Sequence, residues 1–190
     1  NFSSLINEER LIAAEKSLIK LTDKKKLTNL SFLDIGCGSG LSSLAALKLN
    51  CKKIYSIDQD KDSIETTKRV LKFSGKTNFK IEKKDLFDLS ENEKFDVVYS
   101  WGVLHHTGNM YNAIIKSTKL VKRNGILILA LYKKTKLCNL WKLEKLFYKS
   151  APRIVQNFLK IIFIFFFRLA MILKGKSFSD YLNNYKKKRG

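Results

Sequence analysis

Five short apolar segments alternate with longer segments that carry apolar residues at helical spacing, and this alternation constrains the fold more than any other feature. Strands that alternate with helices and are apolar at nearly every position are typical of a parallel sheet covered on both faces. The sequence therefore predicts an α/β fold. The expected strands are Ser31–Ile35, Lys53–Ile57, Asn78–Ile81, Phe95–Tyr99 and Ile126–Leu131.

Helical patterns occupy most of the segments between and around these strands. The expected helices are residues 8–21, Leu41–Asn50, Lys61–Phe73 and Asn109–Lys122, and only a loop or short turn separates the third and fourth strands. A chain of 190 residues that is 45% hydrophobic can bury one sizeable core. We therefore expect a single domain over residues 1–190, with a core at about 28–135 and a helical, basic C-terminal extension at 136–190.

The stretch FLDIGCGSG places three glycines directly after the first strand, where an α/β sheet binds a nucleotide-like ligand. Gly36, Gly38 and Gly40 let the ligand approach the backbone, and Ser39 can help to cap the next helix. The spacing is GxGxG rather than GxGxxG, and Asp34 lies two residues before Gly36. A carboxylate there opposes a pyrophosphate but attracts a cation. The pattern therefore favours S-adenosyl-L-methionine, which carries an ammonium and a sulfonium, over NAD.

Acidic residues also stand at the ends of the second and third strands. Asp58 follows the glycines by about 20 residues, where an acid accepts hydrogen bonds from ribose hydroxyls. The alternative is that Asp58 or Asp60 only caps the next helix, and Asp60 is the stronger candidate for that role. Asp85 can accept from an adenine amino group while Leu86 packs on the ring, although a plain surface turn is the alternative. Gln59, beside Asp58, is included in the expected pocket.

The fourth strand ends in Ser100, Trp101 and Gly102, at the switch point of the sheet, where they are expected to face the cofactor and the acceptor. His105 and His106, the chain's two histidines, follow at the mouth of the expected site. Either can serve as a general base near neutral pH if the acceptor must lose a proton. The alternative is that both histidines pack or hydrogen-bond within their loop.

The three cysteines, Cys37, Cys51 and Cys138, form an odd set without CxxC spacing. This pattern argues against a disulfide framework and against structural zinc, and it fits a reducing cytoplasm. Cys37 is interpreted as a small residue next to the cofactor rather than as a nucleophile. No metal site is expected.

A formal net charge of +20 is consistent with contact with nucleic acid or with an anionic membrane surface, and the alternative is a genome-wide codon bias without functional meaning. The excess is mostly Lys, which does not provide the bidentate phosphate recognition of Arg. The fourth strand also lacks the Asn/Asp-Pro-Pro-Tyr/Phe pattern of enzymes that methylate amino groups of nucleic-acid bases. Nucleic acid is therefore a less favoured partner than a small molecule.

Residues 154–173 form a long apolar segment that Lys160 and Arg168 interrupt. Three interpretations remain open for this segment. It can pack on the core, lie in a membrane surface with its charges at headgroup level, or span a membrane.

Five motifs together resemble the class I S-adenosylmethionine-dependent methyltransferase family over about residues 10–135: LDIGCGSG, SID, KKDLFDL, FDVVYSWGVLHHT and LVKRNGILILALY. The resemblance implies a Rossmann-like doubly wound parallel sheet and S-adenosyl-L-methionine as cofactor. It also implies roles for several residues. The methionine moiety is lined by Asp34, Gly36, Gly38 and Gly40, the ribose by Asp58, and the adenine by Asp85 and Leu86.

The family's sheet normally has seven strands, whereas five can be recognised here, so we expect a chain that lacks its C-terminal strands. The expected function is methyl transfer to a small-molecule, lipid-precursor or cell-surface-precursor acceptor. The alternatives are a methyltransferase of RNA or protein, and a non-catalytic S-adenosylmethionine-binding protein. A cytoplasmic location is expected, with peripheral membrane association through residues 154–173 as an alternative.

Overall fold

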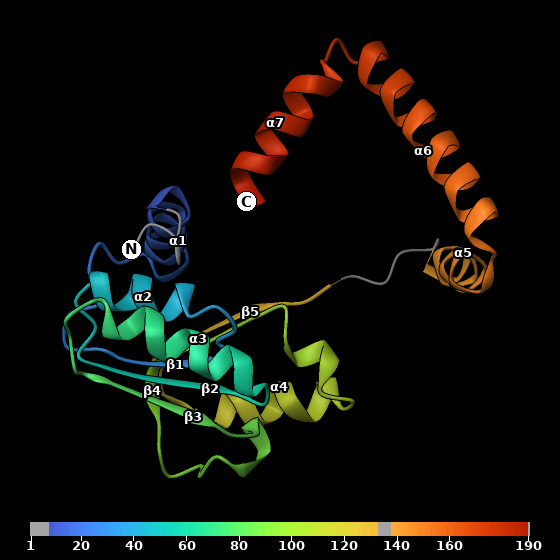
Figure 1. Cartoon of the computed structure of the whole chain (residues 1–190). Helices are drawn as coiled ribbons and strands as arrows, with labels where there is room; N and C mark the ends of the chain where they lie inside the picture. The colour runs from blue at the N-terminus through green and yellow to red at the C-terminus, as the bar shows by residue number, and fades with distance from the viewer. Residues whose placement is uncertain (1–7, 133–137, 190) are drawn as a thin grey trace. The chain divides into compact units, whose positions relative to one another are not determined.

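The computed structural model of the chain describes residues 8–132 and 138–189. It divides into two compact units, Asn1–Lys133 and Lys134–Gly190 (Figure 1). The change of unit falls close to residue 135, where the sequence predicts the end of the core. The single domain over residues 1–190 stays a prediction.

A five-stranded parallel sheet forms the centre of the first unit, in the order β3-β2-β1-β4-β5 (Figure 1). Its strands are β1 Ser31–Ile35, β2 Lys53–Asp58, β3 Phe79–Lys83, β4 Phe95–Trp101 and β5 Val121–Ala130. The chain starts at the central strand, adds β2 and β3 on one side, and then adds β4 and β5 on the other. The doubly wound parallel sheet predicted from the sequence is confirmed, and its switch point lies between β1 and β4.

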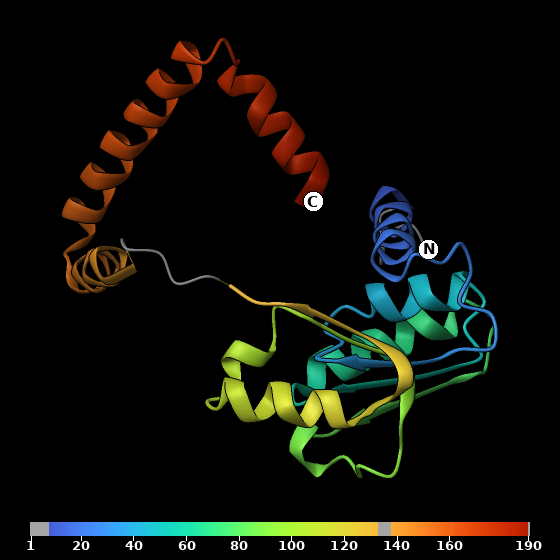
Figure 2. The same ribbon diagram turned by 180° about the vertical axis from the view of Figure 1, so that it is seen from behind.

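Helices cover both faces of this sheet (Figures 1 and 2). One face carries α1 Glu8–Thr22, α2 Leu41–Lys48 and α3 Lys61–Lys72. The other face carries α4 Met110–Lys119 and two short 3₁₀ helices, η2 Leu86–Asp88 and η3 Leu104–His106.

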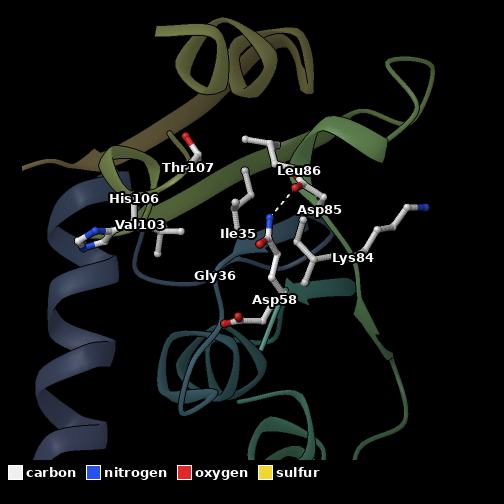
Figure 3. Close-up of a pocket in the computed structure, with 11 residues that line it drawn as sticks. Ile35, Gly36, Asp58, Lys84, Asp85, Leu86, Val103, His106 and Thr107 are labelled. Carbon is white, nitrogen blue, oxygen red and sulfur yellow. Dashed lines mark hydrogen bonds between the residues drawn. The ribbon is translucent and has the colours of Figure 1, made fainter. Parts of the chain in front are cut away.

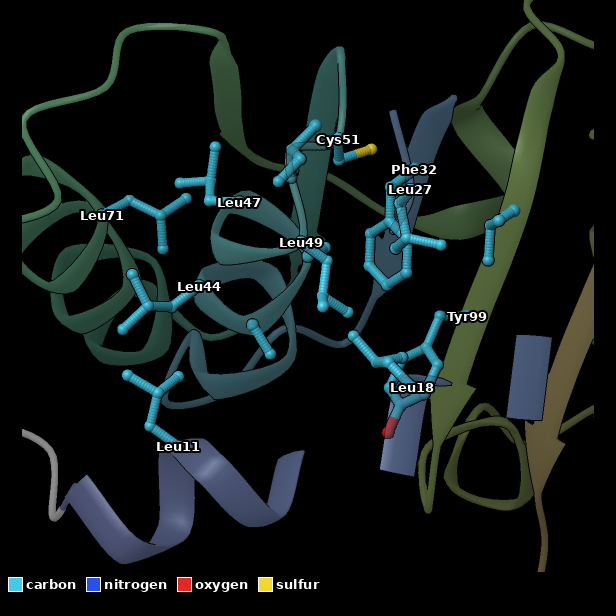
Figure 4. Packing of buried hydrophobic residues seen from close by; sticks show 14 of the residues in the cluster. Leu11, Leu18, Leu27, Phe32, Leu44, Leu47, Leu49, Cys51, Leu71 and Tyr99 are labelled. Carbon is cyan, nitrogen blue, oxygen red and sulfur yellow. The ribbon is translucent and has the colours of Figure 1, made fainter. Parts of the chain in front are cut away.

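Side chains alternate along each strand, so neighbouring residues enter different cores. Phe32 of β1 lies in the cluster with Leu11, Leu44 and Leu71 of α1, α2 and α3 (Figure 4), whereas Leu33 lies in the cluster on the opposite face. Both residues are fully buried. The nearly continuous apolar runs therefore reflect burial on both sides of the sheet.

The last strand and the helix before it differ from the prediction. β5 begins at Val121 rather than Ile126, because Phe95 already pairs with Val121 before an irregularity in the ladder. Lys122 and Arg123 follow Val121 and interrupt the apolar run, so the sequence pattern did not indicate that the strand begins there. The helix predicted for residues 109–122 is correspondingly shorter, and α4 ends at Lys119. β2, β3 and β4 also run slightly past their predicted ends.

The two outermost strands of the first unit have different compositions. β3 carries Lys80, Glu82 and Lys83 among its five residues. β5 carries Lys122 and Arg123 near its start and is otherwise uncharged.

The second unit consists of α5 Cys138–Ser150, α6 Arg153–Leu173 and α7 Phe178–Arg189, as the prediction of a helical extension requires. Phe167 of α6 contacts two rings of α7, with centroids 6.0 Å from Phe178 and 5.3 Å from Tyr181. None of the residues of α6 is buried. Within the described chain, α6 is the one helix long and apolar enough to cross a membrane by length and composition alone.

Candidate functional site

Two hollows lie at the carboxyl ends of the central strands and share one lining residue, Gly36. The small hollow has a volume of about 150 Å³, and the large hollow has a volume of about 510 Å³. The small hollow is lined by Ile35, Gly36, Ile57, Asp58, Gln59, Lys84, Asp85, Leu86, Val103, His106 and Thr107 (Figure 3). The large hollow is lined by Arg10, Ala13, Ala14, Ser17, Asp34, Gly36, Cys37, Gly38, Ser39, Leu41, Ser42, Tyr99 and Trp101.

The glycine turn separates the hollows and leaves no room for a side chain at its first glycine. Gly36 has φ +74°, and a Cβ placed there would lie 2.4 Å from a methyl group of Val103. Gly38 also has a positive φ, but a Cβ there would meet nothing within 4 Å. The backbone at Gly38 therefore borders open space, as a cradle for a ligand requires.

Asp58 holds the glycine turn from the end of β2. One carboxylate oxygen accepts from the Gly38 N–H at 3.0 Å, and the other accepts from the Asp60 N–H at 2.9 Å. Asp60 itself caps α3, because its carboxylate accepts from the Ser63 N–H at 2.9 Å. The prediction that Asp60 is the helix cap is confirmed, and the carboxylate of Asp58 lines the small hollow.

Asp85 and Gln59 both line the small hollow, and the Gln59 amide donates a hydrogen bond to the Asp85 carboxylate. Asp85 also accepts from the Phe87 N–H at 2.9 Å and so begins η2. Leu86 follows, 4% exposed, with an apolar side chain on the hollow. Asp85 thus shapes the local turn and borders the hollow at the same time.

Asp34 is a buried acid at the edge of the large hollow, 2% exposed. Burial raises the pKa of Asp34 to about 6, against a hydrogen bond from the Ser43 hydroxyl at 2.6 Å. Cys37 is also buried, and burial raises the pKa of its thiol to about 12. The Cys37 thiol is therefore a poor nucleophile, in line with its interpretation as a small residue beside the ligand.

The three residues at the tip of β4 point in different directions. Trp101 is 53% exposed, stacks on Tyr99 with ring centroids 6.0 Å apart, and lines the large hollow with it. Ser100 is 1% exposed, donates to the Ile35 carbonyl at 3.2 Å, and lines neither hollow. Gly102 donates its N–H to the Ala130 carbonyl at 2.9 Å and also lies outside both linings.

The two histidines differ in their surroundings. His106 is exposed and lines the small hollow, on the side away from Asp85 (Figure 3). Both ring nitrogens of His105 are shielded, with no hydrogen-bond partner in the described part of the chain. The His105 ring packs against His106 and Tyr132, with centroid distances of 4.0 and 4.7 Å.

The described residues also include lining residues that the sequence did not indicate. Arg10 and the small residues Ala13, Ala14 and Ser17 of α1 form one wall of the large hollow. Residues 8–132 and 138–189 contain no group of three His, Cys, Asp or Glu side chains that could hold a metal ion. The small hollow carries the acids Asp58 and Asp85, and the large hollow carries Asp34 and one guanidinium, that of Arg10.

The fold and the paired hollows define an α/β protein of the class that binds a nucleotide-like cofactor at the switch point of a parallel sheet. A family model described as "Methyltransferase domain" matches residues 26–183. The chain belongs to this methyltransferase domain family.

Relatives and solved structures agree with this assignment. A "Ubiquinone biosynthesis O-methyltransferase" of Pelagibacter ubique (strain HTCC1062) is 35% identical over 112 residues, which cover 58% of this chain and 45% of that protein. The chain spans less than half the length of the curated relatives that it matches.

Solved structures show a likeness of fold alone, because their sequence identity is low. The N-methyltransferase NodS from Bradyrhizobium japonicum has a TM-score of 0.56 and 20% identity, and the match covers 71% of this chain and 75% of that chain. The [4+2]-cyclase SpnF has a TM-score of 0.54 and 18% identity, with 61% and 43% covered. The same fold thus supports more than one kind of reaction.

Proposed function

We propose that the first unit binds S-adenosyl-L-methionine across the two hollows and transfers its methyl group to a small organic acceptor. The observation that carries the proposal is the junction of the hollows at Gly36, with an acid on each side of it. In the small hollow, Asp58 and Asp85 offer carboxylate oxygens to ribose hydroxyls and an adenine amino group. Leu86 supplies an apolar surface for the base.

The large hollow suits the amino-acid end of this cofactor. Asp34 supplies a negative charge for the ammonium and the sulfonium, and Arg10 supplies a positive charge for the carboxylate. Gly38 leaves the backbone bare beside them. The cofactor supplies an electrophilic methyl group when bound, so the protein's remaining task is to hold an acceptor atom in line with it.

We propose that the acceptor enters beside Trp101 and Tyr99. Their stacked rings form a flat apolar wall in the large hollow, and the small residues of α1 leave space opposite. A planar or hydrophobic small molecule fits such a wall better than a highly charged one. The relatives whose names specify ubiquinone biosynthesis support a small-molecule acceptor.

The cofactor proposal is tested by calorimetric titration of S-adenosyl-L-methionine and of its demethylated product. Asp58→Ala should weaken binding by about 1–3 kcal/mol, the cost of losing hydrogen bonds to a charged group. Asp60→Ala is the matched control, since it removes a cap from α3 and leaves the lining of the small hollow intact. Unchanged affinity in folded Asp58→Ala, or equal thermal stabilisation by NAD, would contradict the proposal.

We propose His106 as the better general-base candidate of the two histidines, because its ring is exposed beside Val103, the residue that meets Gly36 where the two hollows join, whereas the nitrogens of His105 are shielded. His106→Gln should lower methyl transfer to an acceptor that must lose a proton, by about 100-fold or more. The pH dependence of the rate on the acidic side should change with it. A rate and pH profile unchanged from the parent protein would remove His106 from the reaction.

We also propose a cytoplasmic protein that can associate peripherally with a membrane through residues 154–173. Its support is that α6 exposes apolar side chains along its whole length.

A further inference from the structure

The side chains of α6 separate into two arcs around the helix axis. At about 100° per residue, the polar residues of α6 fall within an arc of roughly 120°. These polar residues are Arg153, Gln156, Asn157, Lys160 and Arg168. The rest of the circumference is apolar, and it includes six residues that are each at least 43% exposed: Phe158, Ile161, Phe165, Phe166, Leu169 and Ile172.

The neighbouring helices of the second unit lie against other parts of α6. Leu159 and Ile164 border a hollow shared with Tyr148 of α5. Phe167 contacts the rings of α7, and the Arg168 guanidinium lies 4.6 Å from the Phe178 ring centre. Leu159 lies within the apolar arc, so α5 borders one side of it. The six exposed residues named above do not line this hollow and make no ring contact with another helix among the described residues of the second unit.

The shorter helix α5 repeats this arrangement. Lys142, Lys145 and Lys149 lie within an arc of roughly 60°. A second arc of roughly 120° beside the lysines holds apolar residues that are 59–65% exposed: Leu140, Leu143, Leu146 and Phe147. Two successive helices thus pair a basic arc with an exposed apolar arc, which is the pattern of helices that lie in a membrane surface.

The charge of this region matches an anionic surface. Residues 134–190 carry 14 Lys and Arg against 2 Asp and Glu, a net +12 of the chain's +20. The two acids are Glu144 and Asp180, so α6 contains none. Basic residues beside an apolar helix face attract anionic lipid headgroups.

We propose that α5 and α6 dock together in the plane of an anionic lipid bilayer, with both apolar arcs at the boundary of headgroups and acyl chains. The role of this docking rests on the proposed function: it would bring the methyl-transfer site to an acceptor dissolved in the membrane.

The in-plane orientation follows from comparing the two helices. A 13-residue helix is about 20 Å long and cannot cross a hydrocarbon core of about 30 Å. If α6 spanned the membrane, Lys160 would enter the hydrocarbon. In-plane docking covers both arcs and leaves every basic residue of the two helices near headgroups.

The test measures binding of the full chain, without cofactor, to vesicles of phosphatidylcholine with and without phosphatidylglycerol. We expect binding that requires phosphatidylglycerol and weakens with salt. Ile161→Ser in the apolar arc should reduce binding about ten-fold. Met171→Ser, at the centre of the polar arc of the same helix, is the control and should have a much smaller effect.

A second pair of variants tests the charge. Replacing Lys142, Lys145 and Lys149 by Gln should reduce binding to the anionic vesicles about 100-fold. The same replacement of residues 24–26, three exposed lysines of the first unit, alters net charge equally and should change binding far less. Equal effects of both triple variants would mean that net charge alone drives binding, and this would overturn the docking surface.

The depth of α5 in the membrane is a further expected result. The fluorescence of Trp141, observed in a Trp101→Phe background, should be quenched by lipids brominated near the headgroup.

Three other outcomes would overturn the proposal, because each assigns the apolar arc to a different partner. Residues protected from protease because they lie inside the vesicle would show that α6 spans the membrane. A dimer without lipid that Ile161→Ser dissociates would show a second copy. If the chain binds no vesicle but binds RNA, and the triple replacement in α5 weakens that RNA binding, the surface is a nucleic-acid site.

The membrane-docking proposal and the cofactor proposal can be disproved independently of each other. Vesicle binding needs no cofactor, so its loss leaves the calorimetric test of the first unit untouched. If the first unit fails to bind S-adenosyl-L-methionine, vesicle binding still stands or falls on its own variants. Methylation of a vesicle-dissolved acceptor, but not of a water-soluble analogue, should be lost in Ile161→Ser.

Discussion

The two units of the chain use apolar side chains in opposite ways. In the first unit, apolar residues fill two cores on either side of a sheet, and several, such as Phe32 and Leu44, are fully buried. In the second unit, α6 contains no buried residue, although its sequence is richer in Phe and Ile. Apolar composition therefore predicts a core only where the topology packs the apolar faces of helices and sheets against one another. Elsewhere it predicts an exposed apolar surface.

The largest expected difference between the units comes from the same substitution in each. Phe32→Ala should cost about 3–5 kcal/mol, because a buried ring stacked on Tyr99 at 5.8 Å leaves a cavity. Phe165→Ala, at a side chain 62% exposed, should change stability by less than about 0.5 kcal/mol. Denaturant unfolding measures both, followed through Trp101 fluorescence for the first unit and through Trp141 of α5 for the second. Comparable losses would show that α6 is packed in solution and would break the comparison.

Glycine substitutions compare the backbones of the two units. Gly36→Ala and Gly175→Ala both place a side chain at a positive φ, +74° and +64°. Only Gly36 also meets a neighbour, the Val103 methyl at 2.4 Å. We expect Gly36→Ala to cost about 2 kcal/mol more than Gly175→Ala and to abolish cofactor binding. Equal thermal shifts for the two variants would show that Val103 yields without cost.

Acid should unfold the first unit selectively. Asp96 accepts from the Ser31 hydroxyl at 2.6 Å and from the Lys122 ammonium at 2.8 Å, and so joins the starts of β1, β4 and β5. Burial raises the pKa of Asp96, but these hydrogen bonds outweigh it and hold the pKa at about 2. The stability contributed by the carboxylate is present above pH 4 and lost as pH falls towards 2, about 1–2 kcal/mol.

Acid titrations followed by circular dichroism and Trp101 fluorescence would measure this loss. Asp96→Asn should remove the pH-dependent part of it. Asp88→Asn, at an exposed acid of the same unit, should retain it. An acid transition that Asp96→Asn leaves unchanged would locate the sensitive group elsewhere.

The smallest expected effect concerns the buried acid of the large hollow. The pKa of Asp34 is raised to about 6, so the folded protein binds its proton more tightly than the unfolded chain. Ionisation of Asp34 therefore lowers the stability of the ligand-free fold as pH rises from about 4 to about 6. Over the same range it strengthens attraction for a cationic cofactor.

We expect affinity for S-adenosyl-L-methionine to fall about ten-fold between pH 7.5 and pH 5. Calorimetry at several pH values checks this, with Asp34→Asn expected to bind weakly and without the pH dependence. An affinity in the parent protein that is flat over this range would mean that the Asp34 charge does not act on the cofactor. Among the described residues, Asp34 is the one buried charged side chain, so this effect belongs to the first unit alone.

Most of the sheet could be predicted from sequence because strands buried on both faces give continuous apolar runs. The prediction failed at the start of β5, where Lys122 and Arg123 belong to the strand but interrupt the run. The lining residues of α1 could not be predicted, since the docking of that helix depends on tertiary packing. Arg10 carries no local signal that distinguishes it from a solvated charge.

Other site residues could have been read more closely. Side chains alternate along a strand, so Ser100 points away from the face that Tyr99 and Trp101 present to the large hollow. The alternation of side-chain direction along β4 therefore argues against the prediction that all three residues at its end contact the cofactor. Asp60 was distinguished from Asp58 correctly, since its carboxylate accepts from the Ser63 N–H, three residues later, as an N-cap does.

The unequal edges of the sheet limit the size of any assembly that forms by strand addition. β3 presents Lys80, Glu82 and Lys83, charges that discourage a further strand, whereas β5 is uncharged beyond Arg123. Two molecules that pair along β5 each use their one permissive edge, and the resulting ten-stranded sheet ends in charged strands on both sides. Among the described strands, addition at β5 would therefore join two copies and go no further, and the charges of β3 would oppose open-ended fibres.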